Sequence, residues 1–319
     1  MGRSLEGRVA LVTGASEGGN GRAVAVRFAA EGAKVAITAP NEDGLLETLG
    51  HIEAVGGTGL VLPADFGDPS GPRTTLVERT ERTLGPIDIL VNNAVTADMK
   101  PIENWTLEEL DFLQQVNVWT PWLLMGQVLP GMRDRGRGWI VNLTSPSAEL
   151  PPGPPFGKVA SWGYAAYGAT KAAINRLTVS GAAETEGQPV AVNALAPQAA
   201  IDTPAVRASG VMETTLGEGD ASFTREPVET MAEAALALCT GDPDLLTGRI
   251  AYSLQLLVEL GRPVYDLHGE ELVPGVQPSD LVERVRRVIA FHLEFGGPDV
   301  MSLNRPSTPV PDVLRGPIK

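Results

Sequence analysis

The chain has 319 residues, 43% of them hydrophobic, and a formal net charge of −14, which argues against a nucleic-acid partner because nucleic-acid-binding proteins generally present a basic face. The single cysteine, Cys239, excludes an internal disulfide and indicates a reducing compartment. The sequence shows neither a signal peptide nor the ~20 consecutive apolar residues that cross a bilayer, so we expect a cytoplasmic protein without a membrane partner.

Short β-branched runs alternate with longer helical stretches along the chain. The predicted strands lie at 8–14, 34–39, 59–65, 87–94, 138–145, 190–197 and 248–253. The predicted helices between them lie at 22–32, 45–56, 105–130, 164–186 and 227–240. This order implies parallel strands joined by helical crossovers. We therefore expect an α/β fold with a doubly wound, Rossmann-like parallel sheet of about seven strands and helices on both faces.

Two segments break this alternation. Residues 202–226 lack an apolar stripe and follow a strand end, so we predict a mobile lid over the substrate. Beyond residue 262 come a Pro/Gly-rich connection, one predicted helix at 279–295 and a proline-rich tail at 305–319. We accordingly divide the chain into a dinucleotide-binding catalytic domain, 1–262, and a C-terminal extension, 263–319.

The first predicted strand leads through a glycine-rich turn, VALVTGASEGGNGRAVAV, into a helix. Glycines let the backbone approach a pyrophosphate, whose charge is favoured by the N–H groups at a helix start. The turn resembles the TGxxxGxG motif of the short-chain dehydrogenase/reductase family, with Gly19 and Gly21 as the later glycines and one extra residue in the loop. This resemblance spans roughly residues 5–262 and implies that the cofactor is NAD(P)(H).

The choice between NAD and NADP depends on the end of the second strand. Ala39, Pro40 and Asn41 supply neither the carboxylate that holds the ribose of NAD nor the arginine that accepts the extra phosphate of NADP. The missing carboxylate removes a repulsion against that phosphate, whereas Glu17 favours NAD and Arg22 could offset Glu17. The choice stays open, with the balance slightly towards NADP.

Other cofactor elements follow in the family's order. Asp65 matches the aspartate that bonds the adenine ring, although an Asx turn explains it equally well. VNNAV at 91–95 resembles the NNAG element, and VNALAPQAAIDTP resembles the PGxxxT element, with Gln198 in place of the glycine. The resemblance implies a set of cofactor-binding residues: Thr13, Gly14, Ser16, Gly19, Asn20, Gly21, Asp65, Phe66, Asn93, Ala94, Tyr167, Lys171, Pro197, Ile201 and Thr203.

Tyr167 and Lys171 are four residues apart in GYAAYGATKAAI, so they share one face of a helix, whereas Tyr164 has glycine at the corresponding position. Alone, such a pair is ordinary helix surface. It resembles the family's YxxxK motif, which implies that Tyr167 is the catalytic acid/base. A phenol has a pKa of ~10, and a neighbouring ammonium lowers it. The resemblance also implies that Lys171 binds the nicotinamide ribose.

Two helpers complete the implied catalytic set. GWIVNLTS resembles the family's IVNISS element, so Ser145 matches the serine that binds the substrate oxygen, with Ser147 as a weaker rival. Asn117 matches the asparagine that kinks the fourth helix and supports the proton relay. The longer spacing from Ser145 to Tyr167 contains PPGPPFGKVASW, which we expect to form a stiff wall beside the substrate.

The resemblance implies reversible hydride transfer between the cofactor and a small-molecule ketone or secondary alcohol. A lyase or isomerase on the same scaffold and a catalytically silent binding protein remain alternatives. Trp105, Trp119, Trp122 and Phe156 suggest an apolar substrate, but such residues also pack. The three histidines lack ligand spacing, so we expect no metal. Family members associate through the fourth and fifth helices, which implies a homodimer or homotetramer.

Overall fold

The computed structural model describes residues 3–151, 153–154, 156, 163–201, 203 and 225–294. Three expectations fall wholly or mostly outside these residues: the substrate wall at 151–162, the lid at 202–226 and the proline-rich tail at 305–319. Of the predicted wall, Phe156 is described and is 63% exposed. No helix in the described parts is long and apolar enough to cross a membrane.

A seven-stranded sheet forms the centre of the described structure, with its strands in the order β3-β2-β1-β4-β5-β6-β9 and every neighbouring pair parallel. The strands are β1 (Val9–Thr13), β2 (Lys34–Thr38), β3 (Thr58–Val61), β4 (Ile89–Asn92), β5 (Gly138–Leu143), β6 (Val190–Ala196) and β9 (Ile250–Tyr252). All residues of β1, β4, β5 and β6 are buried, as expected for strands that helices cover on both faces. The predicted fold class is confirmed.

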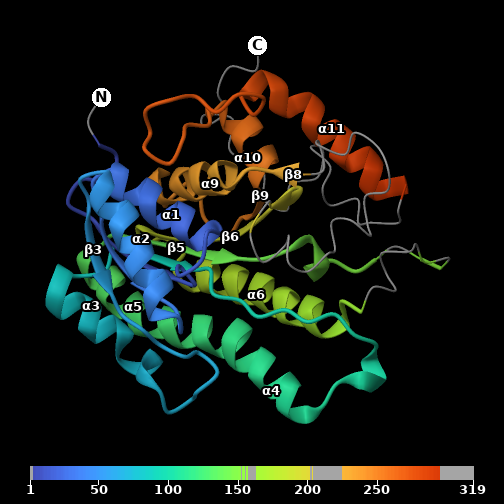
Figure 1. Ribbon diagram of the computed structural model, residues 1–319, viewed down its shortest axis with the longest axis horizontal. Coiled ribbons are helices and arrows are strands. Elements are labelled where there is room, and N and C mark those ends of the chain that lie inside the picture. Colours follow the sequence, from blue (N-terminus) through green and yellow to red (C-terminus); the bar gives the residue numbers. More distant parts are fainter. Residues whose placement is uncertain are drawn as a thin grey trace.

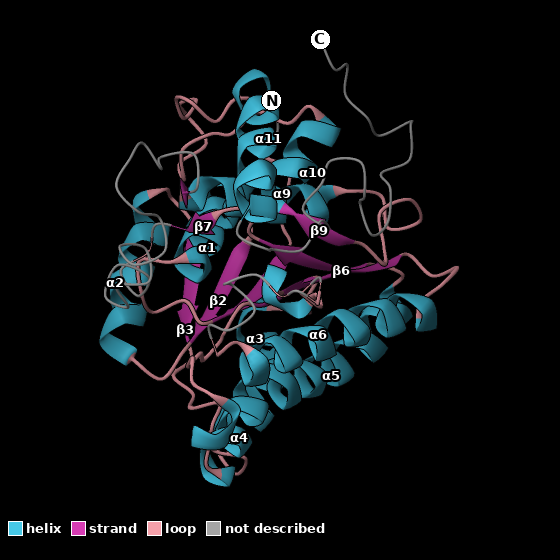
Figure 2. Cartoon of the chain, turned by 90° about the vertical axis from the view of Figure 1, so that its right-hand side faces the viewer, coloured by secondary structure: helices cyan, strands magenta, loops and turns pink. Residues whose placement is uncertain are grey.

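Helices lie on both faces of the sheet (Figures 1 and 2). One apolar cluster involves α1 (Asn20–Ala30), α2 (Glu42–Ala54), α9 (Val228–Thr240) and α10 (Ser253–Leu260). The other involves α3 (Leu76–Leu84), α5 (Thr120–Arg135) and α6 (Ala165–Glu184). The carboxyl ends of the central strands therefore form an edge between two helical layers, where ligands bind in such folds.

The predicted helix at 105–130 is present but interrupted. It consists of α4 (Leu107–Gln114), a π-helical turn (Gln115–Trp119) and α5. A capping box starts α4: Thr106 Oγ1 accepts from the backbone N–H of Glu109, and the Glu109 carboxylate accepts from that of Thr106. The π-helical turn contains Asn117, and π-turns of this kind occur frequently at functional sites.

The C-terminal extension shares the main core. Its helix α11 (Pro278–Glu294) packs against α10, and Val264, Val276, Leu281 and Val285 belong to the same apolar cluster as α1 and α9. This packing confirms the predicted helix at 279–295 and gives the segment after residue 262 a structural connection to the dinucleotide-binding half.

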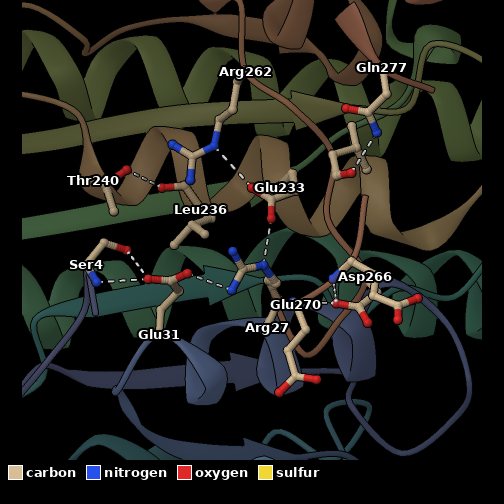
Figure 3. A network of polar contacts seen from close by, with 12 residues as sticks. Ser4, Arg27, Glu31, Glu233, Leu236, Thr240, Arg262, Asp266, Glu270 and Gln277 are labelled. Atoms are coloured by element: carbon tan, nitrogen blue, oxygen red, sulfur yellow. Dashed lines mark hydrogen bonds and ion pairs between the residues drawn. The ribbon is translucent and has the colours of Figure 1, made fainter. Parts of the chain in front are cut away.

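An ionic network centred on the buried Glu233 carboxylate joins α1, α9 and the segment that follows α10 (Figure 3). The Glu233 carboxylate on α9 accepts from Arg27 Nε at 2.6 Å and from Arg262 Nε at 3.1 Å. Arg27 also pairs with Glu31 at 2.8 Å, and Glu31 accepts from Ser4. Helix α1, helix α9 and Arg262, the residue just before the extension, are therefore joined through one carboxylate.

Candidate active site

The glycine-rich turn after β1 is closely packed against the end of β4. Gly14 has a φ of +70°, and a Cβ there would lie 2.7 Å from the Cα of Ala94. A Cβ on Gly21 would lie 2.2 Å from the Gly14 carbonyl oxygen. Both positions therefore exclude a side chain, and the tight path of the turn depends on these two glycines.

Thr13 and Asn93 tie this turn to the loop after β4. Thr13 Oγ1 accepts from the backbone N–H groups of Asn93 at 3.0 Å and Ala94 at 2.9 Å. Asn93 Nδ2 donates to the carbonyl oxygens of Thr13 and Gly14, both at 2.9 Å. The Asn93 side chain thus holds the glycine turn in place from within the protein.

The start of α1 has the features that a pyrophosphate requires. Gly19 is its N-cap and offers no side-chain cap to the first N–H groups. The Asn20 side-chain oxygen is buried without a hydrogen-bond partner, but it is an acceptor, so the group that Asn20 can offer to a phosphate is its backbone N–H in the first turn of α1. Thr203 approaches from the loop after β6, since its Cγ2 lies 3.6 Å from where a Gly19 Cβ would be. Gly19, Asn20, Gly21 and Thr203 are therefore brought together and fit a dinucleotide phosphate.

Arg22 is already engaged at the adenosine end of the site. Its Nη1 and Nη2 donate to the two Glu47 carboxylate oxygens at 2.7 and 2.9 Å, and Nη2 also donates to the Ser16 carbonyl oxygen at 3.1 Å. At the end of β2, Asn41 caps α2 by accepting from the backbone N–H of Gly44. Arg22 can meet a cofactor phosphate only by leaving Glu47.

Asp65 and Phe66 differ from each other in their surroundings. Asp65 is exposed, and its Oδ1 accepts from the backbone N–H of Gly67 at 2.8 Å, which is the Asx turn that the sequence also allowed. Phe66 is 2% exposed in an apolar cluster, and its carbonyl oxygen accepts from Arg73. The side chain of Phe66 is therefore part of the core, whereas that of Asp65 is accessible at the surface.

Ser145 and Tyr167 come together at the carboxyl end of β5. Ser145 caps a short 3-10 helix (Pro146–Ala148), with its Oγ accepting from Ser147 N at 3.2 Å and from Ser147 Oγ at 3.0 Å. Burial raises the pKa of Tyr167 to about 12, while a hydrogen bond with Ser145 acts to lower it. At neutral pH, Tyr167 is thus a protonated phenol beside a serine hydroxyl.

Lys171 lies one helical turn beyond Tyr167 and is 3% exposed. Its Nζ is 5.7 Å from the centre of the Tyr167 ring and donates to the Leu143 carbonyl oxygen at 2.8 Å. Burial lowers the pKa of this ammonium to about 8. The group therefore carries a positive charge beside the phenol at neutral pH and can lose it in mildly alkaline solution.

Asn117 is connected to Tyr167 through Thr170, a residue that the sequence analysis missed. The Asn117 amide bonds the backbone N–H and carbonyl of Thr96, at 2.9 and 2.8 Å, and its Nδ2 lies 3.1 Å from Thr170 Oγ1. Thr170 Oγ1 donates to the Tyr167 carbonyl oxygen at 2.7 Å. Its position between the tyrosine and the lysine was the only available signal.

Gly168 is a second residue that the sequence analysis did not assign. A Cβ there would lie 2.5 Å from the Ser147 carbonyl oxygen. Helix α6 can therefore approach the short helix that carries Ser145 only because position 168 has no side chain. The glycine directly after Tyr167 was the sequence signal.

The remaining predicted residues belong to the loop after β6. Ile201 is 5% exposed in β7 (Ala200–Ile201), and Pro197 is partly buried directly after β6. The backbone N–H of Thr203 donates to the Ile201 carbonyl at 2.9 Å. Within 202–226, Arg225–Glu226 form β8, which pairs with β7, so this end of the predicted lid is a strand.

Other candidate chemistry receives no support from the described residues. They contain no group of three or more His, Cys, Asp and Glu side chains placed to hold a metal ion. Cys239 is buried, and burial raises the pKa of its thiol. Trp105 donates to the Lys100 carbonyl, and the Lys100 ammonium lies 4.7 Å from a Trp105 ring centre, so this tryptophan packs locally.

Known proteins resemble this chain over most of its length. The pattern of the short chain dehydrogenase family matches residues 8–213. A short chain dehydrogenase of Pseudocercospora fijiensis is 35% identical over 72% of this chain and 67% of its own length. Human hydroxysteroid dehydrogenase-like protein 2 is 29% identical over 92% of this chain and 68% of its own. A solved 3-oxoacyl (acyl-carrier-protein) reductase of Agrobacterium tumefaciens with NADP bound is 31% identical, with a TM-score of 0.66 over 78% of this chain and 93% of its own.

Proposed function

Because this chain belongs to the short-chain dehydrogenase/reductase family, we propose that it transfers a hydride reversibly between a nicotinamide cofactor and a ketone or secondary alcohol. The observation that carries the proposal is the group formed by Ser145, Tyr167 and Lys171. A phenol bonded to a serine hydroxyl, with a buried ammonium one helical turn away, can bind a carbonyl oxygen and give it a proton.

Each residue has a separate task in this mechanism. The bound nicotinamide ring supplies or accepts the hydride and, when oxidised, adds a positive charge beside the phenol. Ser145 and Tyr167 hold the substrate oxygen, and Tyr167 donates a proton to it in reduction or removes one in oxidation. The Lys171 ammonium, 5.7 Å from the Tyr167 ring centre, would act together with the positive charge of an oxidised nicotinamide to stabilise the phenolate and so lower the raised Tyr167 pKa when cofactor binds. Asn117 supports the proton relay and holds α6 through Thr170.

The cofactor proposal is NAD(P)(H), with NADP slightly favoured. The end of β2 carries no carboxylate that would repel an extra phosphate, and the similar reductase of Agrobacterium tumefaciens has NADP bound. Gly14, Gly19, Asn20 and Gly21 would hold the pyrophosphate, with Thr203 opposite them. Asp65 would meet the adenine ring.

Three further expectations belong to the same proposal. The catalytic domain comprises 1–262 and the extension 263–319. The chain forms a homodimer or homotetramer through α4, α5 and α6, where Trp119 and Trp122 are exposed with ring centres 6.3 Å apart. We place the protein in the cytoplasm, where its cysteine stays reduced.

Replacement of Tyr167 by phenylalanine tests the mechanism. The variant keeps the ring and loses the proton, so we expect turnover to fall by about three orders of magnitude while cofactor still binds. Absorbance of the reduced nicotinamide, with a panel of ketones and secondary alcohols, measures turnover, and calorimetry measures binding. Near-normal turnover of the variant would remove Tyr167 from its assigned role.

A further inference from the structure

The loop after β6, residues 197–203, is fixed at its start by Gln198, which stands where the family's motif has glycine. Gln198 is fully buried. Its backbone N–H donates to Ser253 Oγ at 3.0 Å, and its side-chain oxygen accepts from the backbone N–H of Gln255 at 3.2 Å. Helix α10 begins at Ser253 without a side-chain cap from its own N-cap residue. Gln198 therefore supplies that cap from the loop.

Glu226 holds the same loop from the opposite side. It lies on β8, directly beside Ile201 of β7, and is 1% exposed. Its carboxylate accepts from the Ala199 backbone N–H at 2.9 Å, from Thr230 Oγ1 at 2.6 Å and from Ser253 Oγ at 2.7 Å. Each of these partners donates a hydrogen bond, as a buried carboxylate requires.

Ser253 joins the two halves, since it accepts from Gln198 and donates to Glu226. We name Gln198, Glu226 and Ser253 the loop clamp. All three are buried, and they come from the loop, from β8 and from α10. The clamp therefore fixes the loop to two elements distant in sequence.

The C-terminal extension packs against the same loop. Val288 of α11 is fully buried in a cluster with Ala196, Ala199 and Tyr252. Arg284, also on α11, donates to the Arg225 carbonyl oxygen of β8. The extension thus contacts both the loop, at Ala199, and β8, at Arg225.

The far end of the loop reaches the phosphate-binding turn. Thr203 Cγ2 lies 3.6 Å from the position of a Cβ on Gly19. In the proposed function, the loop that is fixed at Ala199 and reaches the turn at Thr203 would lie beside the nicotinamide half of the cofactor, as the resemblance of this loop to the PGxxxT element implies.

We infer that the loop clamp is a positioning device for the nicotinamide half of the cofactor, with Glu226 as its central residue. Glu226 acts through the loop and touches no reacting atom. The inference rests on the proposed function only in assuming that the chain binds a nicotinamide dinucleotide. It predicts that loss of the clamp weakens the dinucleotide and leaves its adenosine half bound as before.

Glu226→Gln tests this inference, because the amide nitrogen is a donor placed among donors. Glu233→Gln is the matched control: Glu233 is also 1% exposed, but it pairs with Arg27 and Arg262, away from the loop. Calorimetry compares NADP⁺ with adenosine 2′,5′-bisphosphate, and NAD⁺ with AMP. We expect Glu226→Gln to weaken the dinucleotide about tenfold and the half-cofactor less than about twofold, while Glu233→Gln changes neither ratio.

Ser253→Ala provides a second route if Glu226→Gln does not fold, since it removes only the hydroxyl that links the two halves of the clamp. It should weaken the dinucleotide in the same selective way. The inference is overturned if the variants weaken binding of the dinucleotide and of the half-cofactor equally, or if they weaken neither. Wild-type protein that binds neither dinucleotide overturns the proposed function as well, so the two failures are distinct.

Discussion

The Lys171 ammonium nitrogen donates a hydrogen bond to the Leu143 backbone carbonyl oxygen, 2.8 Å away at the end of β5. The bond holds a charge inside the protein, directly beside the phenol that we propose to transfer the proton. Burial lowers the pKa of this group to about 8. Burial of this charge beside the phenol therefore lowers the free energy of unfolding at neutral pH.

This cost gives a pH dependence with a definite sign. Below pH ~8 Lys171 is protonated in both the folded and the unfolded chain, and folding carries the full burial cost of its charge. Between pH ~8 and ~10.5 the unfolded chain binds more protons, so the free energy of unfolding should rise with pH by about 3 kcal/mol from this group. Urea unfolding at pH 7 to 9.5 measures the slope.

Lys171→Met provides the comparison for that slope. The variant should be more stable than wild type at pH 7 by about 1 kcal/mol, show a flatter pH profile and lose turnover. If the variant retains the wild-type slope, another group causes it.

Gly168→Ala should impair catalysis without preventing folding. Its methyl group would lie 2.5 Å from the Ser147 carbonyl oxygen, so the short helix that carries Ser145 must move. We expect kcat to fall roughly tenfold or more, with KM for the cofactor unchanged. Gly50→Ala on α2 is the control, because nothing lies within 4 Å of its new Cβ, and it should stabilise by about 0.5 to 1 kcal/mol. Equal kinetics for the two variants would contradict this account.

The residues of the ionic network around Glu233 should contribute unequally to the free energy of unfolding. Glu233→Gln leaves Arg27 and Arg262 without their shared carboxylate, so we expect a loss of about 2 to 4 kcal/mol. Arg262→Met, at the more exposed end, should cost about 1 kcal/mol or less. Urea unfolding midpoints of the two variants measure these losses. Equal losses would show that burial of the Glu233 charge does not determine how much each residue contributes to stability.

Glu47→Gln should change the choice of cofactor. Arg22 binds both Glu47 oxygens, and its release leaves a guanidinium near the end of β2. We expect affinity for NADP⁺ to rise about threefold or more relative to NAD⁺, because arginine binds phosphate well. Arg22→Gln should lower the same ratio. If the affinities for NADP⁺ and NAD⁺ change by the same factor, Arg22 does not contact the extra phosphate of NADP⁺.

The sheet was predictable because each strand is a short apolar run between helical stretches, and the seven predicted runs are the seven strands. The break at Gln115–Trp119 left no mark on the hydrophobic period, since one extra residue in a helix hardly alters it, and only the family resemblance, which implies a kink at Asn117, indicated it. Helices α3 and α10 were missed. The sequence of α3 is dominated by charged residues and threonine, and that of α10 is a short apolar run that resembles a strand.

Some residues of the candidate site could likewise be predicted from the sequence, and others could not. Ser145, Tyr167 and Lys171 fall on neighbouring elements, so their approach followed from the fold. Glu226 gave no local signal, because its partners Ala199 and Ser253 are each 27 residues away and the surrounding segment looked like a loop. A buried carboxylate is defined by donors that the fold brings to it, and a short stretch of sequence does not contain them.

The apolar cluster that unites Val264, Val276, Leu281 and Val285 with α1 and α9 makes the last part of the chain and the first part depend on each other's surfaces for burial. A recombination that exchanged the C-terminal segment between relatives would have to bring the matching surfaces of both helices with it. Chimaeras joined at residue 262 should therefore aggregate unless α1 and α9 are transferred together with the C-terminal segment that packs on them.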